Sequence, residues 1–120
     1  MILIAMALLL PQEAVATRAW LSDDPRVQFE DGARIRGVMP SARDVREYQV
    51  VVVCQIQPDF SLASCESARV TPEDEGLRRG GPDAVGQVRI KDVEGGPRPG
   101  ESLVFDIRVQ ASRRSMRAPG

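Results

Sequence analysis

Two cysteines are the residues best suited to covalent chemistry in this chain. Cys54 and Cys65 are separated by ten residues, a spacing that matches neither the C-x-x-C motif of dithiol redox proteins nor the ligand spacing of zinc sites. An even number of cysteines in a small exported domain is typical of a disulfide. We therefore predict a structural Cys54–Cys65 disulfide. The alternative is a pair of buried thiols in a cytosolic protein.

The other reactive residue types favour binding over catalysis. The chain has no histidine, which excludes Ser-His-Asp and Cys-His nucleophiles and removes the commonest metal ligand. Glu73, Asp74 and Glu75 could contact a cation, but their spacing is not that of a calcium loop. We predict a solvated helix start there, and we expect no metal, no cofactor and no enzyme activity. A small hydrolase based on Asp or Glu is the weakest interpretation.

The charge balance argues against a polyanionic partner. The 120 residues include 16 basic and 17 acidic ones, a formal net charge of −1, whereas phosphate binding needs a cationic excess on one face. The pairs Arg78-Arg79 and Arg113-Arg114 are too few for a nucleic-acid surface. We expect neither nucleic acid nor a small-molecule substrate. The length suits one domain, and aromatic residues at 4% predict an aliphatic core.

A β-hairpin over 48–70 must position the cysteines. Residues 48–56 are β-branched and free of Gly and Pro, 58–61 have turn chemistry, and 62–70 form a second, weaker strand. A two-residue loop would place Cys54 opposite Cys65 directly. A three-residue loop pairs residue 56 with residue 62 and needs a one-residue bulge near 63–64 to bring the cysteines together. We prefer the three-residue loop because it puts Leu62 on the core face.

The rest of the domain follows from weaker signals. A helix start at 71–75 is predicted to stop quickly at Gly76 and at 80–82, with a second helical turn or two over 83–88. An irregular loop over 94–100 leads to a cleanly alternating strand over 103–109. The expected fold is therefore α+β, a small antiparallel three-stranded sheet (hairpin 48–70 plus strand 103–109) with one or two short helices.

The first residues indicate export. An unbroken apolar run over 1–10 precedes the small-residue stretch Ala14-Val15-Ala16, which is typical of a secretory signal peptide over 1–16. No Lys or Arg precedes that run, and the alternative is a buried N-terminal helix or strand. Residues 17–39 are expected to form an irregular arm in which Trp20 is a packing anchor. The domain is expected over 40–111 and a disordered tail over 112–120.

Residues 40–109 resemble the C-terminal domain of the TonB family of energy transducers, especially its small cysteine-bearing versions. Four features in order carry the resemblance: Val-x-Cys-x-Ile ending at residue 56 and followed by Gln57-Pro58-Asp59; Leu62-x-x-Cys65; the segment 73–88; and Gly96-Pro97-x-x-Gly100 before the last strand. Phe60 replaces the family's turn glycine, so we expect a different turn. The segment 73–88 is rich in Arg and Gly where the family is rich in Ala.

The resemblance implies a receptor-binding domain in the periplasm, associated with the membrane through its partners. The chain shows neither the membrane anchor nor the Pro-rich spacer of a complete TonB. In the family the last strand pairs with a short segment of an outer-membrane receptor, so we expect such a segment, or inner-membrane transport components, as partners. The implied edge strand is Leu103, Val104, Phe105, Asp106, Ile107, Arg108 and Val109. The alternative is an exported, disulfide-stapled structural or accessory domain with no transport role.

Overall fold

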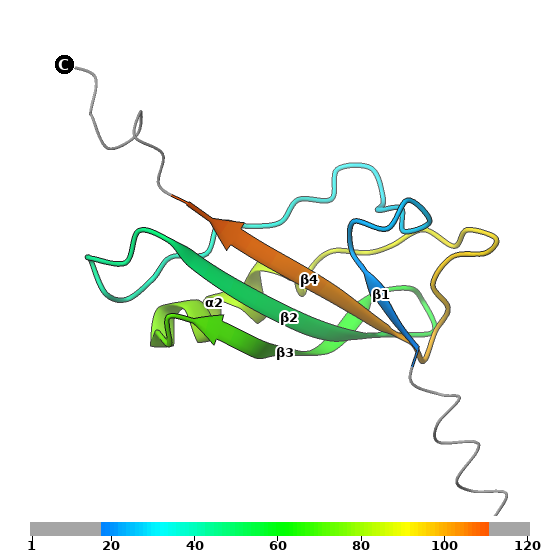
Figure 1. The fold of residues 1–120 in the computed structure, drawn as a ribbon. Helices are drawn as coiled ribbons and strands as arrows, with labels where there is room; N and C mark the ends of the chain where they lie inside the picture. The colour runs from blue at the N-terminus through cyan, green and yellow to red at the C-terminus, as the bar shows by residue number, and fades with distance from the viewer. Residues whose placement is uncertain (1–17, 111–120) are drawn as a thin grey trace, which may run out of the picture.

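The computed structural model describes residues 18–110, which form one mixed sheet and one helix (Figure 1). The elements are β1 (Ala19–Leu21), β2 (Tyr48–Ile56), β3 (Leu62–Thr71), α2 (Glu75–Val85) and β4 (Ser102–Val109). The strand order is β1-β4-β2-β3, with β1 parallel to β4 and the other pairs antiparallel. The α+β class is confirmed. The expected signal peptide and tail lie outside the described residues.

The expectation of three antiparallel strands is wrong, because the sheet gains the parallel strand β1. Three residues are too few to show a hydrophobic period, so nothing in the sequence marks them as a strand. Trp20 anchors this strand: it is 3% exposed, its Nε1 donates to Glu101 Oε1 at 2.9 Å, and the guanidinium of Arg18 lies 4.2 Å from its ring centroid. Burial of this large side chain and its hydrogen bond hold β1 against the start of β4.

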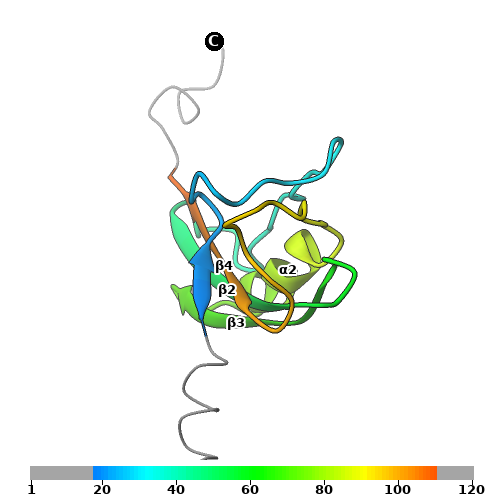
Figure 2. The ribbon, with the colours of Figure 1, turned by 90° about the vertical axis from the view of Figure 1, so that its right-hand side faces the viewer.

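The core lies on one face of the sheet, where α2 and the loops pack (Figure 2). Alternate residues of β2 are buried on this face, as the period of two predicts: Val50, Val52, Cys54 and Ile56. Phe105, Leu103 and Leu77 meet them from β4 and α2. Val51 and Val53 point to the opposite face and are only half-buried. Among residues 18–110, α2 and the loops therefore cover one face of the sheet, and no element packs on the other face.

The hairpin has the preferred three-residue loop. The Gln57 amide donates to the Ser61 carbonyl at 2.9 Å, and Ile56 lies opposite Leu62. Phe60 has φ of 66°, the left-handed conformation that commonly ends such a loop. The expectation of a different turn is therefore wrong: Phe60 adopts the backbone conformation usually given to glycine, and its ring packs against the core.

Helix α2 is continuous, so the predicted stops at Gly76 and at Gly80-Gly81-Pro82 are wrong. A proline inside a helix removes the hydrogen bond to the carbonyl four residues earlier, here that of Arg78. The hydroxyl of Ser67 on β3 donates to that carbonyl at 2.7 Å and replaces the missing amide. The glycines let the helix approach the sheet, because a Cβ added at Gly81 would lie 2.7 Å from Val50 Cγ1. Tertiary contacts thus outweigh poor helix propensity.

Candidate functional site

The outer edge of β4 is the expected binding edge, and its two halves differ (Figure 1). Its first residues pair with β1: the Ser102 amide donates to the Arg18 carbonyl at 2.9 Å, and the Ser22 amide to the Val104 carbonyl at 2.8 Å. Leu103 and Val104 therefore already have a strand beside them. Among residues 18–110, no strand pairs with the outer side of β4 beyond Val104. The unpaired part of the expected edge is Phe105–Val109, which we call the free edge.

The free edge presents backbone hydrogen-bonding groups in the plane of the sheet. Successive residues of a strand direct their amide and carbonyl groups alternately to the two sides. Ser102 and Val104 direct theirs toward β1, while the Glu101 carbonyl accepts from the Ile56 amide at 2.9 Å on the β2 side. By this alternation, Asp106 and Arg108 direct both an N–H and a C=O outward. An extended segment from another chain can satisfy these groups by strand addition.

The side chains of the same two residues form a charged pair on the open face. Arg108 Nη2 lies 3.1 Å from Asp106 Oδ2, and Gln49 Nε2 donates to Asp106 Oδ1 at 3.0 Å. The Gln49 hydrogen bond, followed by those from Arg108, holds the pKa of Asp106 below its usual value. The carboxylate is therefore charged at neutral pH. Charges on an exposed edge discourage indiscriminate strand pairing and select partners of complementary charge.

The other face of the free edge is apolar. Ile107 is half-buried against the core, and Val109 is 39% exposed although it faces the same side. Phe105 is fully buried. A strand added here would therefore find apolar side chains on one face and charged ones on the other, which is the alternation of an amphipathic strand.

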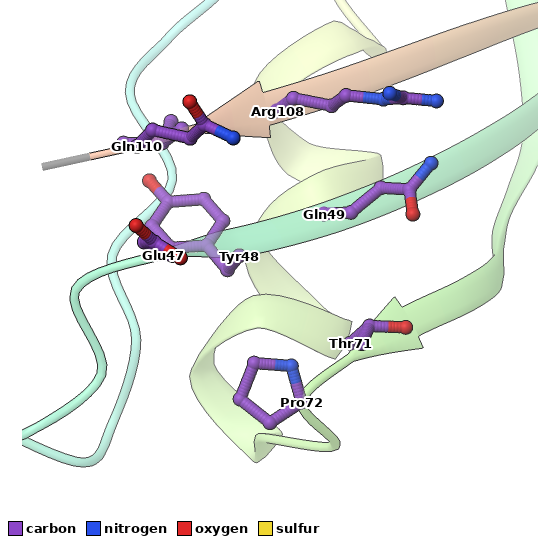
Figure 3. A pocket seen from close by; sticks show the side chains of 8 residues that line it. Glu47, Tyr48, Gln49, Thr71, Pro72, Arg108 and Gln110 are labelled. Carbon is purple, nitrogen blue, oxygen red and sulfur yellow. The ribbon is translucent and has the colours of Figure 1, made fainter.

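A cavity of about 300 Å³ lies beside the end of the free edge (Figure 3). Its lining comes from three segments: Glu47, Tyr48 and Gln49 of β2 and its approach, Thr71 and Pro72 at the end of β3, and Arg108, Val109 and Gln110. The Tyr48 hydroxyl donates to the Val38 carbonyl at 2.5 Å. The lining offers amide, hydroxyl and charged groups of both signs. Sequence reasoning did not single it out because no one segment carries its pattern.

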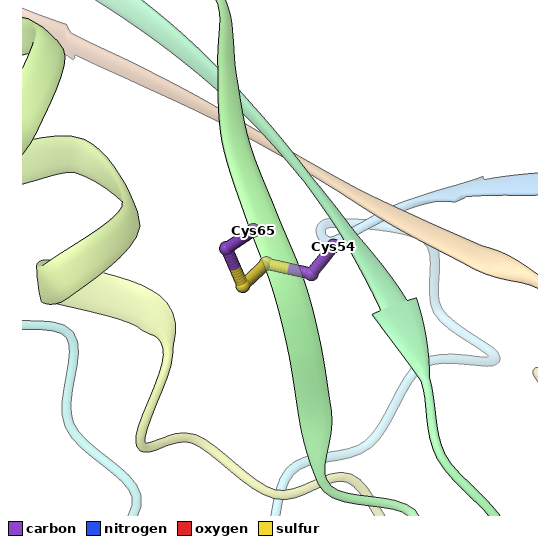
Figure 4. The surroundings of a disulfide bond; sticks show 2 residues. All are labelled: Cys54 and Cys65. Atoms are coloured by element: carbon purple, nitrogen blue, oxygen red, sulfur yellow. A yellow bond between two sulfur atoms is a disulfide. The ribbon is translucent and has the colours of Figure 1, made fainter.

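The opposite edge, β3, is distorted and stapled. Register shifts interrupt its pairing with β2 at two places, and bulges of this kind make an edge a poor template for a further strand. One bulge lies at Ser64, whose φ is 53°, and it brings Cys65 beside Cys54. The predicted disulfide is confirmed, with Cα atoms 4.0 Å apart (Figure 4). The predicted bulge near 63–64 is confirmed with it.

The acidic run 73–75 caps the helix. Asp74 is 8% exposed, and its carboxylate accepts from the amides of Ser41 at 2.7 Å, Ala42 at 3.0 Å and Leu77 at 3.0 Å. The first two of these hydrogen bonds are the main cause of its lowered pKa. The predicted helix start is confirmed, but Asp74 is buried, not solvated, because it ties residues 41–42 to the helix. Within 18–110, no group of three or more Cys, Asp and Glu side chains could hold a metal ion.

Comparisons with known proteins do not name a family. The chain has no significant match to any protein-family model, curated protein or solved structure. The resemblance to TonB therefore rests only on the residues quoted above. Over the described part of the chain, no helix has the length and apolar character needed to cross a membrane.

Proposed function

We propose that this chain is an exported, non-enzymatic protein-binding domain that takes up an extended segment of a partner along its free edge. The observation that carries the proposal is the end of β1 opposite Val104, which leaves the outward backbone groups of Asp106 and Arg108 available. Four such groups, alternating donor and acceptor, suit a strand of about five residues.

The environment of this edge adds affinity and selectivity. The adjoining cavity has polar lining groups, which can receive a side chain or the end of the added segment. The partly exposed Val109 supplies apolar area on the other face. Backbone pairing therefore provides binding, and these neighbouring side chains provide discrimination between segments.

The resemblance to TonB suggests the partner. We propose a short periplasmic segment of a TonB-dependent outer-membrane receptor, with inner-membrane transport components as further partners. The disulfide fits an oxidising, exported compartment. Mass spectrometry of the secreted protein, with and without reductant, tests export: we expect removal of residues 1–16 and a mass increase of about 2 Da on reduction, one hydrogen for each sulfur of the broken bond.

Binding is tested by NMR titration of the oxidised protein with receptor plug-segment peptides. We expect amide shift changes to concentrate at Asp106 and Arg108 and to extend to Gln110 beside the cavity. The matched control is the same peptide N-methylated at alternate residues. This peptide keeps every side chain but loses the backbone N–H groups on one side of the strand, which would donate to the free edge. Equal binding of the methylated peptide, or shifts that avoid the free edge, would contradict strand addition.

The second candidate function is an exported accessory domain with no transport role. The stapled, bulged β3 edge favours it, because a disulfide there supports a rigid scaffold without any partner. A protein that stays folded and disulfide-bonded but gives no shifts with any receptor segment would support this alternative.

A further inference from the structure

The free edge is complementary to itself. It runs from Phe105 to Val109, so its midpoint is Ile107, and one charged residue lies on each side of that midpoint. We propose that two copies of this chain pair their free edges antiparallel, about a twofold axis that passes beside Ile107, to form a continuous sheet across a homodimer. The inference concerns the same edge as the proposed function but needs no foreign partner.

The backbone restricts the registers that are available. Outward groups must meet outward groups, so Asp106 or Arg108 of one copy must lie opposite Asp106 or Arg108 of the other. Centring the pair on Ile107 places Asp106 opposite Arg108 at both ends. Each of these pairs exchanges two N–H···O=C hydrogen bonds, which gives four across the interface. This register also uses the whole free edge of both copies and stops where β1 begins.

The charges select the same register. Directly opposed side chains on one face lie within about 4.5–5.5 Å at Cβ, so opposite charges attract and like charges repel. The centred register forms two carboxylate–guanidinium pairs on the open face. A shift by two residues in one direction opposes the two Asp106 carboxylates, and a shift in the other direction opposes the two Arg108 guanidinium groups. The shifted registers therefore lose the attraction and shorten the paired segment.

The apolar face agrees with this arrangement. In the centred register Ile107 lies opposite its own copy, and Phe105 lies opposite Val109. Val109, 39% exposed in the single chain, would lose part of that exposure. The pairing is isologous and closed by twofold symmetry, so it ends at two copies and does not continue into a fibre.

Charge reversal tests the register in the full chain by analytical ultracentrifugation from about 10 µM to about 1 mM. We expect the unmodified protein to dimerise in this range. D106R and R108D should each weaken the dimer by at least about tenfold, because each opposes like charges at both ends. An equimolar mixture of D106R with R108D should recover dimerisation, as should the double variant D106R/R108D alone. E66R, an exposed charge reversal on β3, is the control and should leave dimerisation unchanged.

The outcomes separate this inference from the proposed function. A chain that stays monomeric throughout, or E66R weakening the dimer as much as D106R, overturns self-pairing. A double variant that stays monomeric overturns the register. Peptide binding by a chain that never self-associates supports the proposed function alone. Self-association without peptide binding, tested also at concentrations where the unmodified chain is monomeric, supports the dimer alone.

Discussion

Replacing Gly81 by alanine tests whether close contact between helix and sheet explains the glycine pair in α2. A Cβ at this position would lie 2.7 Å from Val50 Cγ1 and 2.8 Å from Val52 Cγ2. Both valines are fully buried on the central strand, and their branched side chains have little rotamer freedom. The added methyl group must therefore push the helix away from the sheet or strain the core.

The size of the effect comes from two opposing terms. Alanine improves helix propensity by about 1 kcal/mol relative to glycine, while overpacking a core costs about 1–3 kcal/mol. The neighbouring Gly80 offers a matched control, because the atoms nearest its added Cβ all belong to Val38, the closest being Cγ1 at 3.1 Å. The G80A variant gains the same helix propensity as G81A, but its added methyl group has a much smaller steric cost. We expect G81A to be about 1–3 kcal/mol less stable than G80A.

Urea denaturation followed by far-ultraviolet circular dichroism measures this difference directly. Thermal unfolding is a second measurement, in which each 1 kcal/mol of lost stability lowers the Tm of a domain of this size by roughly 4–8 °C. If G81A proves as stable as G80A, or more stable, the account of Gly81 as the point of closest helix–sheet approach is refuted. Unchanged m-values in both variants would show that the comparison concerns the native packing.

Three further predictions concern the disulfide, the helix cap and the helix interior. Replacing Cys54 and Cys65 by alanine, or reducing them, should lower the unfolding free energy by about 2–3 kcal/mol, measured in urea with and without reductant; an unchanged midpoint would contradict this. Because Asp74 has a folded-state pKa below its ordinary 3.8, its contribution is present above the unfolded-state pKa and is lost as the pH falls through the folded-state pKa. Stability should therefore decline below about pH 5, and D74N should flatten part of that decline in acid titrations followed by circular dichroism; an identical decline in D74N would count against the cap. Ser67→Ala should cost about 0.5–1.5 kcal/mol in urea denaturation, because it leaves the Arg78 carbonyl without its donor, and no measurable loss would show that water replaces the hydroxyl.

The hairpin shows how far local sequence information reaches. Residues 48–56 are rich in β-branched residues and free of Gly and Pro, and the turn chemistry at 58–61 favours a short loop. Pairing of Ile56 with Leu62 then requires a bulge before the cysteines meet. All of this depends on neighbours within about twenty residues, so the amino-acid sequence is sufficient to predict the loop, the bulge near 63–64 and the disulfide. The second register shift, between Val51 and Val52, has no such local signal.

The free edge shows where that information stops. The alternation of 103–109 identified the strand but not the extent of its exposed side, because β1 comes from a segment more than eighty residues away in the chain. Likewise, the cavity beside Arg108 joins three segments that meet only in the folded sheet. Whether Asp74 is solvated or buried depends on residues 41–42 packing over it.

The sequence by itself determined the class of fold, the hairpin and its disulfide, because a run of β-branched residues, turn residues and the spacing of the cysteines act over short distances. Only the tertiary structure decided that α2 continues through Pro82, since a hydroxyl on β3 supplies the hydrogen bond that the helix cannot make for itself. Only the tertiary structure decided how much of β4 is paired within residues 18–110, since burial of Trp20 brings β1 to one end of that edge and no other described strand covers the rest.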